Sequence, residues 1–243
     1  MLNRSLITLD VDWAPDFAIE LAARVLIESR IKATWFITHM SPAIASLRKR
    51  SDLFELGVHP NFLPGSSHGE SVKEVIAHVM RLVPDAISMR SHSAYQSGPM
   101  LNEVTASTRI RFDSSIFLPE MSYISPVEHL TPNGSIYRIP FFWADDYEML
   151  KQRPAWRPER YKNVQGIKIF MFHPIHIALN SIDHGSYVRV KQRYQGIDCL
   201  PKEEIPTSSD YSAGCRTFFL ELVGFIKNTE SEGYMLKEVV VEK

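Results

Sequence analysis

Residues suited to catalysis or ligand binding follow directly after several strand-like segments of the sequence. They are Asp10 and Asp12, His59 and His68, Arg90 and His92, Trp143, Asp145 and Asp146, and His173 and His176. In parallel α/β folds the carboxyl ends of the strands meet at one edge, and active sites are built there. We therefore expect these residues to gather at one end of the folded chain.

The residue types favour hydrolysis at a metal ion. In an extended chain, Asp10 and Asp12 point to the same face, so one can bind a metal ion while the other stays free as a base. An aspartate with two histidines binds Zn²⁺ and also Co²⁺, Ni²⁺ or Mn²⁺, and it leaves positions open for water. Such an ion lowers the pKa of bound water, and a histidine from another strand can protonate a leaving group.

Each of these residues also has an ordinary structural explanation when it is taken alone. An Asp-x-Asp pair often caps a turn or a helix, and His59 or His173 is compatible with a hydrogen-bonded structural histidine. Arg90 is compatible with a surface ion pair, and Trp143 with the core. Their occurrence after five different strands favours a shared site.

The composition excludes several other classes of protein. The 243 residues are 44% hydrophobic and 23% charged, which is typical of a globular chain with a sizeable core. There are 27 Lys and Arg residues against 28 Asp and Glu residues, so we expect no nucleic-acid partner. Cys199 and Cys215 make no disulfide framework. We expect no membrane span and no export signal, and hence a cytoplasmic protein.

Strand-like and helix-like segments alternate along the chain, which indicates a largely parallel sheet or barrel in one domain, residues 1–243. The predicted strands are Ser5–Leu9, Ala33–Thr38, Phe54–Val58, Ala86–Met89, Arg111–Asp113, Ile136–Phe142, Ile167–Phe172 and Met235–Val241. The predicted helices are Phe17–Ser29, Ala43–Lys49, residues 72–83, Met100–Ser107 and Ala213–Glu232. Met149–Gly166 and His184–Ser212 are predicted to be loops.

Several motifs come in the order of the polysaccharide deacetylase, or NodB-homology, family. They are Leu9-Asp10-Val11-Asp12, Lys32-Ala33-Thr34-Trp35-Phe36, Glu55-Leu56-Gly57-Val58-His59, Arg90, Phe112-Asp113-Ser114-Ser115, Phe172-His173 and the ending Glu232-Gly233-Tyr234. The chain resembles that family from residue 6 to about 240. The resemblance implies an irregular (β/α)7-type barrel, and a metal-dependent hydrolase that removes acetyl from an N-acetylated sugar.

The resemblance also implies a role for each matching residue. Asp10 matches the general base, Asp12 the metal-binding aspartate, His59 the first metal histidine, Arg90 the arginine that holds the base, Trp143 the pocket tryptophan and His173 the general acid. His176 is the alternative acid and, like His92, a candidate substrate contact. Asp145 and Asp146 receive no role.

Two departures from the family pattern leave choices open. The second metal histidine usually comes four residues after the first, but that position is Leu63, so His68 is the nearest candidate for the third ligand. We expect the segment Pro60–Ser67, with two prolines and a glycine, to return His68 to the ion. His92 is the rival, and Asn61 is a weaker one. The family's Arg-x-Pro-Tyr reads Arg90-Ser91-His92-Ser93, which leaves the oxyanion donor open.

Two other functions are compatible with the sequence. A non-catalytic glycan-binding protein on the same barrel would explain the altered motifs. Asp10-Val11-Asp12 also resembles the opening of a haloacid-dehalogenase-type phosphatase, but Ala14 departs from that pattern and the histidines stay unexplained. For the deacetylase we expect an N-acetylated saccharide of surface-polysaccharide metabolism as substrate, carried by a nucleotide or a lipid.

Overall fold

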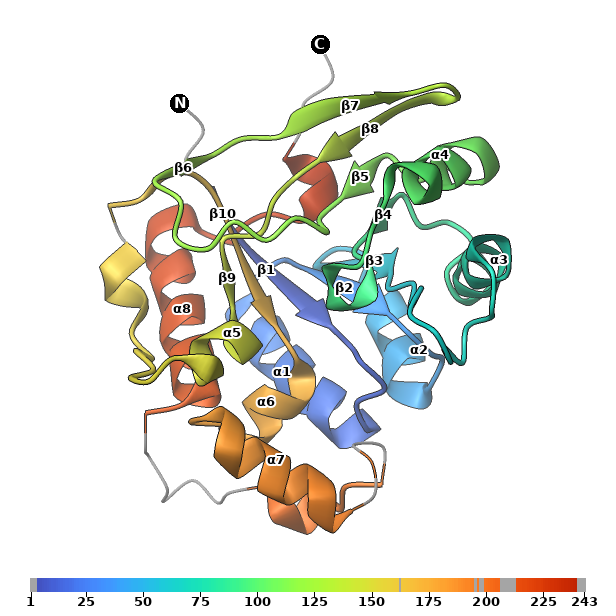
Figure 1. The fold of residues 1–243 in the computed structure, drawn as a ribbon. Helices are drawn as coiled ribbons and strands as arrows, with labels where there is room; N and C mark the ends of the chain where they lie inside the picture. Colours follow the sequence, from blue (N-terminus) through green and yellow to red (C-terminus); the bar gives the residue numbers. More distant parts are fainter. Residues whose placement is uncertain (1–3, 162, 195, 197–198, 206–212, 240–243) are drawn as a thin grey trace.

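The computed structural model describes residues 4–161, 163–194, 196, 199–205 and 213–239. A curled, mainly parallel sheet lies at its centre, with helices around it (Figure 1). The strands are β1 (Arg4–Asp10), β2 (Ala33–Ile37), β3 (Phe54–Val58), β4 (Ser88–Met89), β5 (Phe112–Asp113), β6 (Tyr123–Ile124), β7 (Val127–Thr131), β8 (Gly134–Arg138), β9 (Trp143–Ala144) and β10 (Gln165–Phe172). Their order is β6-β10-β1-β2-β3-β4-β5-β8-β7, and β9 pairs with β10.

One stretch of chain, residues 134–144, links the two sides of the curled sheet. Its first part, β8, pairs in parallel with β5 and antiparallel with β7. Its last part, β9, pairs in parallel with β10 on the other side. The sheet therefore curls into an irregular barrel, which confirms the predicted α/β barrel fold.

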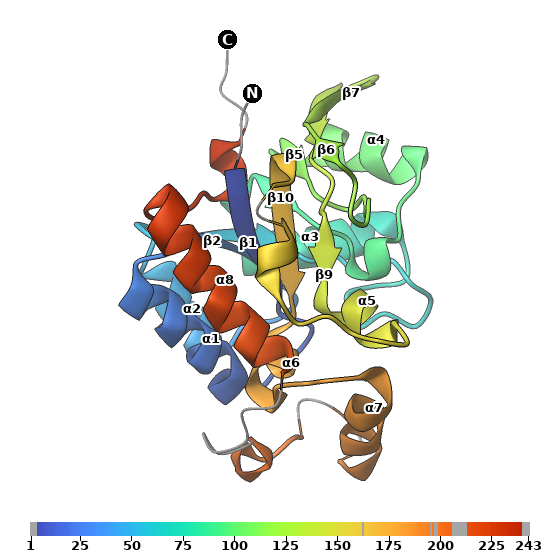
Figure 2. The same cartoon turned by 90° about the vertical axis from the view of Figure 1, so that its left-hand side faces the viewer.

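The helices lie outside the sheet, with α1, α2 and α8 on one side and α3 and α4 on another (Figure 2). Their bounds are α1 (Asp16–Ser29), α2 (Pro42–Arg48), α3 (Val72–Leu82), α4 (Gly98–Ser107), α5 (Asp145–Leu150), α6 (Pro174–Leu179), α7 (His184–Arg193) and α8 (Cys215–Glu230). Ser71 and Glu74 form a capping box that begins α3. No helix in the described part of the chain is long and apolar enough to span a membrane.

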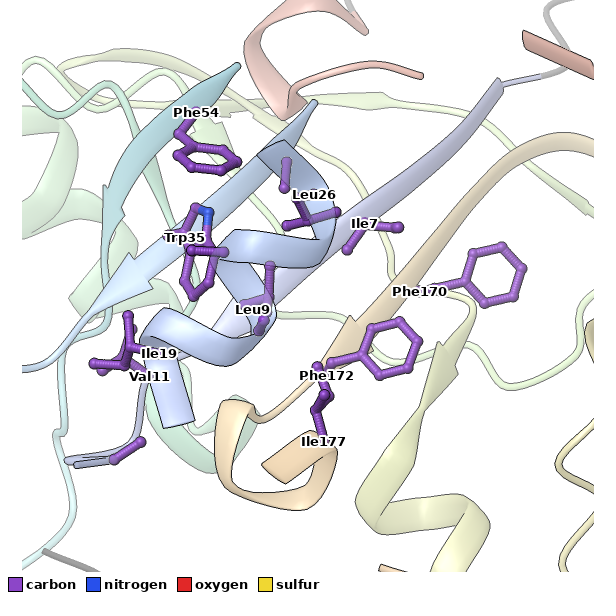
Figure 3. Close-up of a cluster of buried hydrophobic side chains, with 14 of the residues drawn as sticks. Ile7, Leu9, Val11, Ile19, Leu26, Trp35, Phe54, Phe170, Phe172 and Ile177 are labelled. Carbon is purple, nitrogen blue, oxygen red and sulfur yellow. The ribbon is translucent and has the colours of Figure 1, made fainter. Parts of the chain in front are cut away.

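Side chains of β1 alternate between two packed layers. Ile7 and Leu9 pack between the sheet and α1, together with Val11 just beyond the strand (Figure 3). Leu6 belongs instead to a second cluster, formed with side chains such as Met171 from neighbouring strands. Because strand side chains alternate, Asp10 shares the face of Leu6 rather than the face of Leu9. The apolar pattern of the strand thus directs the Asp10 carboxylate away from the outer helices.

The last predicted strand, Met235–Val241, is wrong over residues 235–239, and residues 240–241 lie outside the described part. Leu236–Glu238 is a 3₁₀ turn instead. The backbone N–H of Leu236 donates to Thr34 Oγ1, and that of Lys237 donates to the Glu55 carboxylate. Side chains from β2 and β3 therefore hold this segment in place of a strand neighbour.

The predicted loop His184–Ser212 begins with helix α7, while its residues 195, 197–198 and 206–212 lie outside the described part. Asp183 caps α7 by accepting a hydrogen bond from the Ser186 N–H. No residue of α7 is buried, so the helix carries no strong apolar pattern in the sequence. Short helices α5 and α6 and strand β7 were likewise not predicted. The predicted strand Ile136–Phe142 matches β8 only up to Arg138, and the predicted loop Met149–Gly166 overlaps the end of α5 and the start of β10.

Candidate active site

Asp12, His59 and His92 converge on one point at the carboxyl ends of three strands. Asp12 lies just beyond β1, His59 directly follows β3, and His92 follows β4. Asp12 Oδ1 is 3.0 Å from His59 Nε2 and 3.0 Å from His92 Nδ1. One potential ligand atom from each residue lies within 4.8 Å of the others. A carboxylate and two imidazoles in this arrangement can bind a divalent cation, and Asp12, His59 and His92 are called the ligand group below.

The electrostatics of Asp12 favour its charged form. Burial raises the pKa of this carboxyl, but hydrogen bonds to three histidines, among them His173, outweigh burial and hold the pKa well below its usual value. Burial lowers the pKa of His59, but Asp10 and Asp12 outweigh burial and raise this pKa overall. Asp12 therefore stays ionised and available as a ligand around neutral pH.

Asp10 and Arg90 form a buried ion pair beside this group. Arg90 Nη1 donates to Asp10 Oδ1 at 2.9 Å and to Thr8 Oγ1 at 2.8 Å. The rest of the guanidinium donates to the backbone oxygen and hydroxyl of Ser114. The second carboxylate oxygen of Asp10 is 3.8 Å from His59 Nε2. Arg90 thus fixes Asp10 in one orientation next to the histidines.

His173 is held by Asp145, the first residue of α5. The two groups meet at 2.7 Å between Nδ1 and Oδ1, and the backbone N–H of His173 donates to the other Asp145 oxygen at 2.7 Å. His173 Nε2 is 3.4 Å from Asp12 Oδ2. Burial lowers the pKa of His173, but Asp145 and Asp12 outweigh it and hold the pKa well above its usual value. The raised pKa favours the protonated imidazole, and its Nε2 faces Asp12 and the ligand group.

Asp145 is a residue whose role the sequence did not reveal. Its position directly after a strand was the only available signal, and many strand-end aspartates are helix caps. Its carboxyl is fully buried, which raises its pKa, but His173 and His176 outweigh burial and lower the pKa overall. Only the folded chain shows that this charge is paired with His173.

Backbone turns beside the site adopt left-handed conformations that non-glycine residues rarely use. Asp12 and Trp13 have φ of 45° and 55°, and Ser93 and Ala94 have φ of 55° and 53°. Such conformations cost free energy and persist where the surrounding structure enforces them, often at functional sites. The first turn is held by the Trp13 N–H, which donates to Thr38 Oγ1.

These groups open into one cavity of about 350 Å³. Its polar lining residues are Asp10, Asp12, His59, Arg90, Ser91, His92, Ser93, Asp146 and His173, and its apolar or aromatic ones are Ala94, Phe117, Phe141, Ala144, Tyr147, Leu150 and Met171. Phe117, Phe141 and Tyr147 carry no signal in the sequence, because isolated aromatic residues are far more common in cores.

The structure does not bring His68 to the ligand group. Its Nδ1 accepts a hydrogen bond from the Asn61 N–H at 3.1 Å, and its Nε2 donates to the Thr38 carbonyl at 2.9 Å. Burial lowers its pKa to about 4. The loop does bring His68 back towards the site, but both of its ring nitrogens are hydrogen-bonded to backbone atoms. His92, the rival, occupies the third position.

Trp143 and His176 also lie apart from the cavity lining. The Trp143 ring is buried, stacks on Phe218 with 4.3 Å between ring centroids, and donates through Nε1 to Glu148. Because β9 directs this side chain outward, it is a core residue and not a pocket wall. His176 is buried behind His173 against Tyr187, and burial lowers its pKa to about 4.

Comparisons with known proteins bear on the family of this chain and on its fold. The family model for WbmS-like polysaccharide deacetylases matches residues 7–191. A crystal structure from Bordetella bronchiseptica, described as a polysaccharide deacetylase involved in O-antigen biosynthesis, is 33% identical, covers 92% of this chain and 90% of that chain, and has a TM-score of 0.78.

A 4-α-glucanotransferase from Thermococcus litoralis is similar in fold alone. Its TM-score is 0.54 at 10% identity, covering 98% of this chain and 38% of that chain. A comparison with curated proteins found no match. The match to the deacetylase model and the barrel fold decide against the phosphatase alternative. The chain belongs to the WbmS-like polysaccharide deacetylase family.

Proposed function

We propose that this protein is a metal-dependent hydrolase that removes the acetyl group from an N-acetylated sugar. The observation that carries the proposal is the meeting of three arrangements in one cavity: the Asp12, His59 and His92 group, the Asp10–Arg90 pair and the His173–Asp145 pair. Together they supply a cation site, a base and an acid, which are the requirements of amide hydrolysis by water.

Asp12, His59 and His92 would hold the metal ion, with Zn²⁺ as the first choice and Co²⁺, Ni²⁺ or Mn²⁺ as alternatives. The fit rests on the donor set, because one carboxylate and two imidazoles suit these ions and leave positions for water. When bound, the ion would activate water and polarise the amide carbonyl. His92 takes the place of the histidine that Leu63 replaces, at the proline position of the Arg-x-Pro-Tyr motif.

Asp10 and His173 would move the protons. Asp10 accepts a proton from the attacking water, because Arg90 orients its carboxylate beside the ligand group. His173 donates a proton to the leaving nitrogen, because Asp145 keeps it protonated with Nε2 directed at the site. The C–N bond breaks, and acetate and a free amino sugar are the products.

Ser93 would supply the hydrogen bond to the developing oxyanion. It lines the cavity, and its backbone N–H has no hydrogen-bond partner in the described part of the chain. The left-handed conformations of Ser93 and Ala94 hold this amide out of regular structure. A preorganised donor at such a point stabilises the transition state of acyl transfer.

The substrate would be an N-acetylated sugar of a surface polysaccharide, or its nucleotide- or lipid-linked precursor. The support is the Bordetella relative, which is described as involved in O-antigen biosynthesis. A screen of acetate release over N-acetylated sugars, nucleotide sugars and oligosaccharides tests the proposal. We expect activity with zinc, loss on chelation and recovery on adding zinc back. Metal binding together with glycan binding but no acetate release would instead support the non-catalytic alternative.

A further inference from the structure

Three buried residues at the end of β5 have no part in the proposed chemistry: Asp113, Ser114 and Ser115. Ser114 binds the Arg90 guanidinium, which donates to its backbone oxygen and to its hydroxyl, each at 2.8 Å. The contacts of Ser115 lead instead to the next stretch of chain, residues 91–96, called the 91–96 loop below. Neither Asp113 nor Ser115 is among the residues that line the cavity, so they can influence the reaction only through this loop.

Ser115 holds the 91–96 loop at both of its ends. At the start of the loop, the Ser115 hydroxyl accepts hydrogen bonds from the backbone N–H of Ser91 at 2.8 Å and from the Ser91 hydroxyl at 3.0 Å. At the end of the loop, the Ser115 carbonyl accepts a hydrogen bond from Gln96 Nε2 at 2.9 Å. The Ser115 hydroxyl donates its own proton to the Asp113 carboxylate. With one donor bond and two acceptor bonds, this hydroxyl is fully used and has a single orientation.

A buried ion pair closes these contacts into a ring. Arg138, the last residue of β8, pairs with the Asp113 carboxylate and also donates to Gln96 Oε1. Asp113 accepts a further hydrogen bond from the backbone N–H of Ser115 at 3.1 Å. Asp113, Ser115, Gln96 and Arg138 are called the β5 ring below. Because the amide oxygen of Gln96 faces a guanidinium, its NH₂ group is directed at the Ser115 carbonyl.

The 91–96 loop has a strained backbone and contains two groups of the proposed chemistry. Ser93 and Ala94 have φ of 55° and 53°, and such conformations persist where the surrounding structure enforces them. Outside the β5 ring, the His92 N–H donates to the Pro60 carbonyl at 2.9 Å. His92 is the proposed metal ligand of this loop, and Ser93 the proposed oxyanion donor. A loop displaced by about 1 Å would move both groups away from the reacting atoms.

We propose that Ser115 and Gln96 are positioning residues of the proposed deacetylase. Through them, the β5 ring keeps His92 in the ligand group and the Ser93 N–H directed at the cavity. Neither residue touches the substrate in this scheme, because both act through the backbone of the 91–96 loop. The inference rests on the proposed function and adds two residues that no step of it uses.

The test alters the two ends of the loop separately in the zinc-loaded enzyme. Ser115→Ala removes the hydroxyl that binds Ser91. It should lower kcat by about tenfold to a hundredfold for the N-acetylated sugar most active in the screen, while KM changes by less than about twofold. Gln96→Glu keeps an oxygen for Arg138 but cannot donate to the Ser115 carbonyl, so kcat should fall by about tenfold. The zinc Kd, measured by titrating the metal-free protein, should rise by about tenfold in both variants because His92 is displaced.

Thr34→Val is the matched control for a buried hydroxyl. The Thr34 hydroxyl donates to the Glu55 carboxylate at 3.0 Å and accepts the backbone N–H of Leu236 at 2.8 Å, as the Ser115 hydroxyl does with its own partners. Thr34 lies near the start of β2, away from the carboxyl ends of the strands. Thr34→Val and Ser115→Ala should both lower the urea midpoint of unfolding. Only Ser115→Ala should change kcat and the zinc Kd.

Wild-type values of kcat and zinc Kd in Ser115→Ala or in Gln96→Glu would overturn the positioning role of that residue. An equal loss of kcat in Thr34→Val would overturn it for both, because lower stability would then explain the effect. Absence of acetate release from every sugar by the wild-type enzyme would overturn the proposed function instead. The zinc Kd would then test the contact with His92 alone, and an unchanged value in both variants would overturn that too.

Discussion

Replacing His92 by alanine should weaken zinc binding far more than replacing His68. His92 Nδ1 is 3.0 Å from Asp12 Oδ1, whereas both nitrogens of His68 are bonded to the backbone. Structural sites with four protein ligands bind zinc with a free energy of about 10–16 kcal/mol, so one ligand contributes about 3 kcal/mol to zinc binding. That energy corresponds to about a hundredfold change in Kd. We expect His92→Ala and His59→Ala each to raise the zinc Kd by about this factor.

His68→Ala should instead lower the stability of the folded protein. It removes two hydrogen bonds and a ring that packs on Trp13, which itself contacts the His92 ring. The free energy of unfolding should fall by about 1–3 kcal/mol, since each hydrogen bond contributes about 0.5–1.5 kcal/mol. The zinc Kd should rise by less than about tenfold, because His68 acts on the ligand group only through Trp13, which contacts His92.

Competition titration of zinc against a chelating indicator and urea unfolding of the metal-free protein separate the two effects. His78→Ala is the control, because His78 stacks on His68 and touches no member of the ligand group in the described structure. If His68→Ala loses zinc as strongly as His59→Ala while His92→Ala keeps a full complement, the assignment of His92 is wrong. The loop would then have to rearrange when metal binds.

Three further predictions concern the proton carriers and the core. Asp10→Asn should lower kcat by about 10²–10⁴ while zinc content, measured by elemental analysis, stays that of the wild type; a wild-type rate would rule out Asp10 as the base. Asp145→Asn removes the charge that raises the pKa of His173, so this acid loses its proton at lower pH. The basic limb of the kcat/KM profile should therefore move to lower pH, and an unchanged limb would assign it to another group. Trp143→Ala should lower the unfolding free energy by about 3–5 kcal/mol, which is roughly 6–20 °C in Tm; a raised KM without loss of Tm would return Trp143 to the pocket.

The sequence by itself determined a largely parallel α/β sheet or barrel and the end of it at which the site lies, and the family resemblance favoured the barrel. Alternating strand and helix patterns imply parallel strands, and parallel strands bring their carboxyl ends together. Asp10, Asp12, His59, Arg90 and His173 each lie at the end of a strand or within two residues of it, so a local pattern was enough to place them in one cavity. The helix from Phe17 was predicted almost to the residue, because its apolar side faces a sheet.

Only the tertiary structure shows which side chains from distant parts of the sequence contact one another. Local sequence does not show which atoms the ring nitrogens of a loop histidine contact. Only the tertiary structure shows that the backbone of Thr38, just beyond β2, and of Asn61 binds both nitrogens of His68, while His92 lies beside Asp12. The side of β9 on which Trp143 lies was decided by the space beside Phe218, which is distant in sequence. The pairing of Asp145 with His173 likewise joins two strands that no motif connects. Spacing in the chain predicts which residues reach the edge of the barrel, while contacts between distant segments decide which atoms face one another.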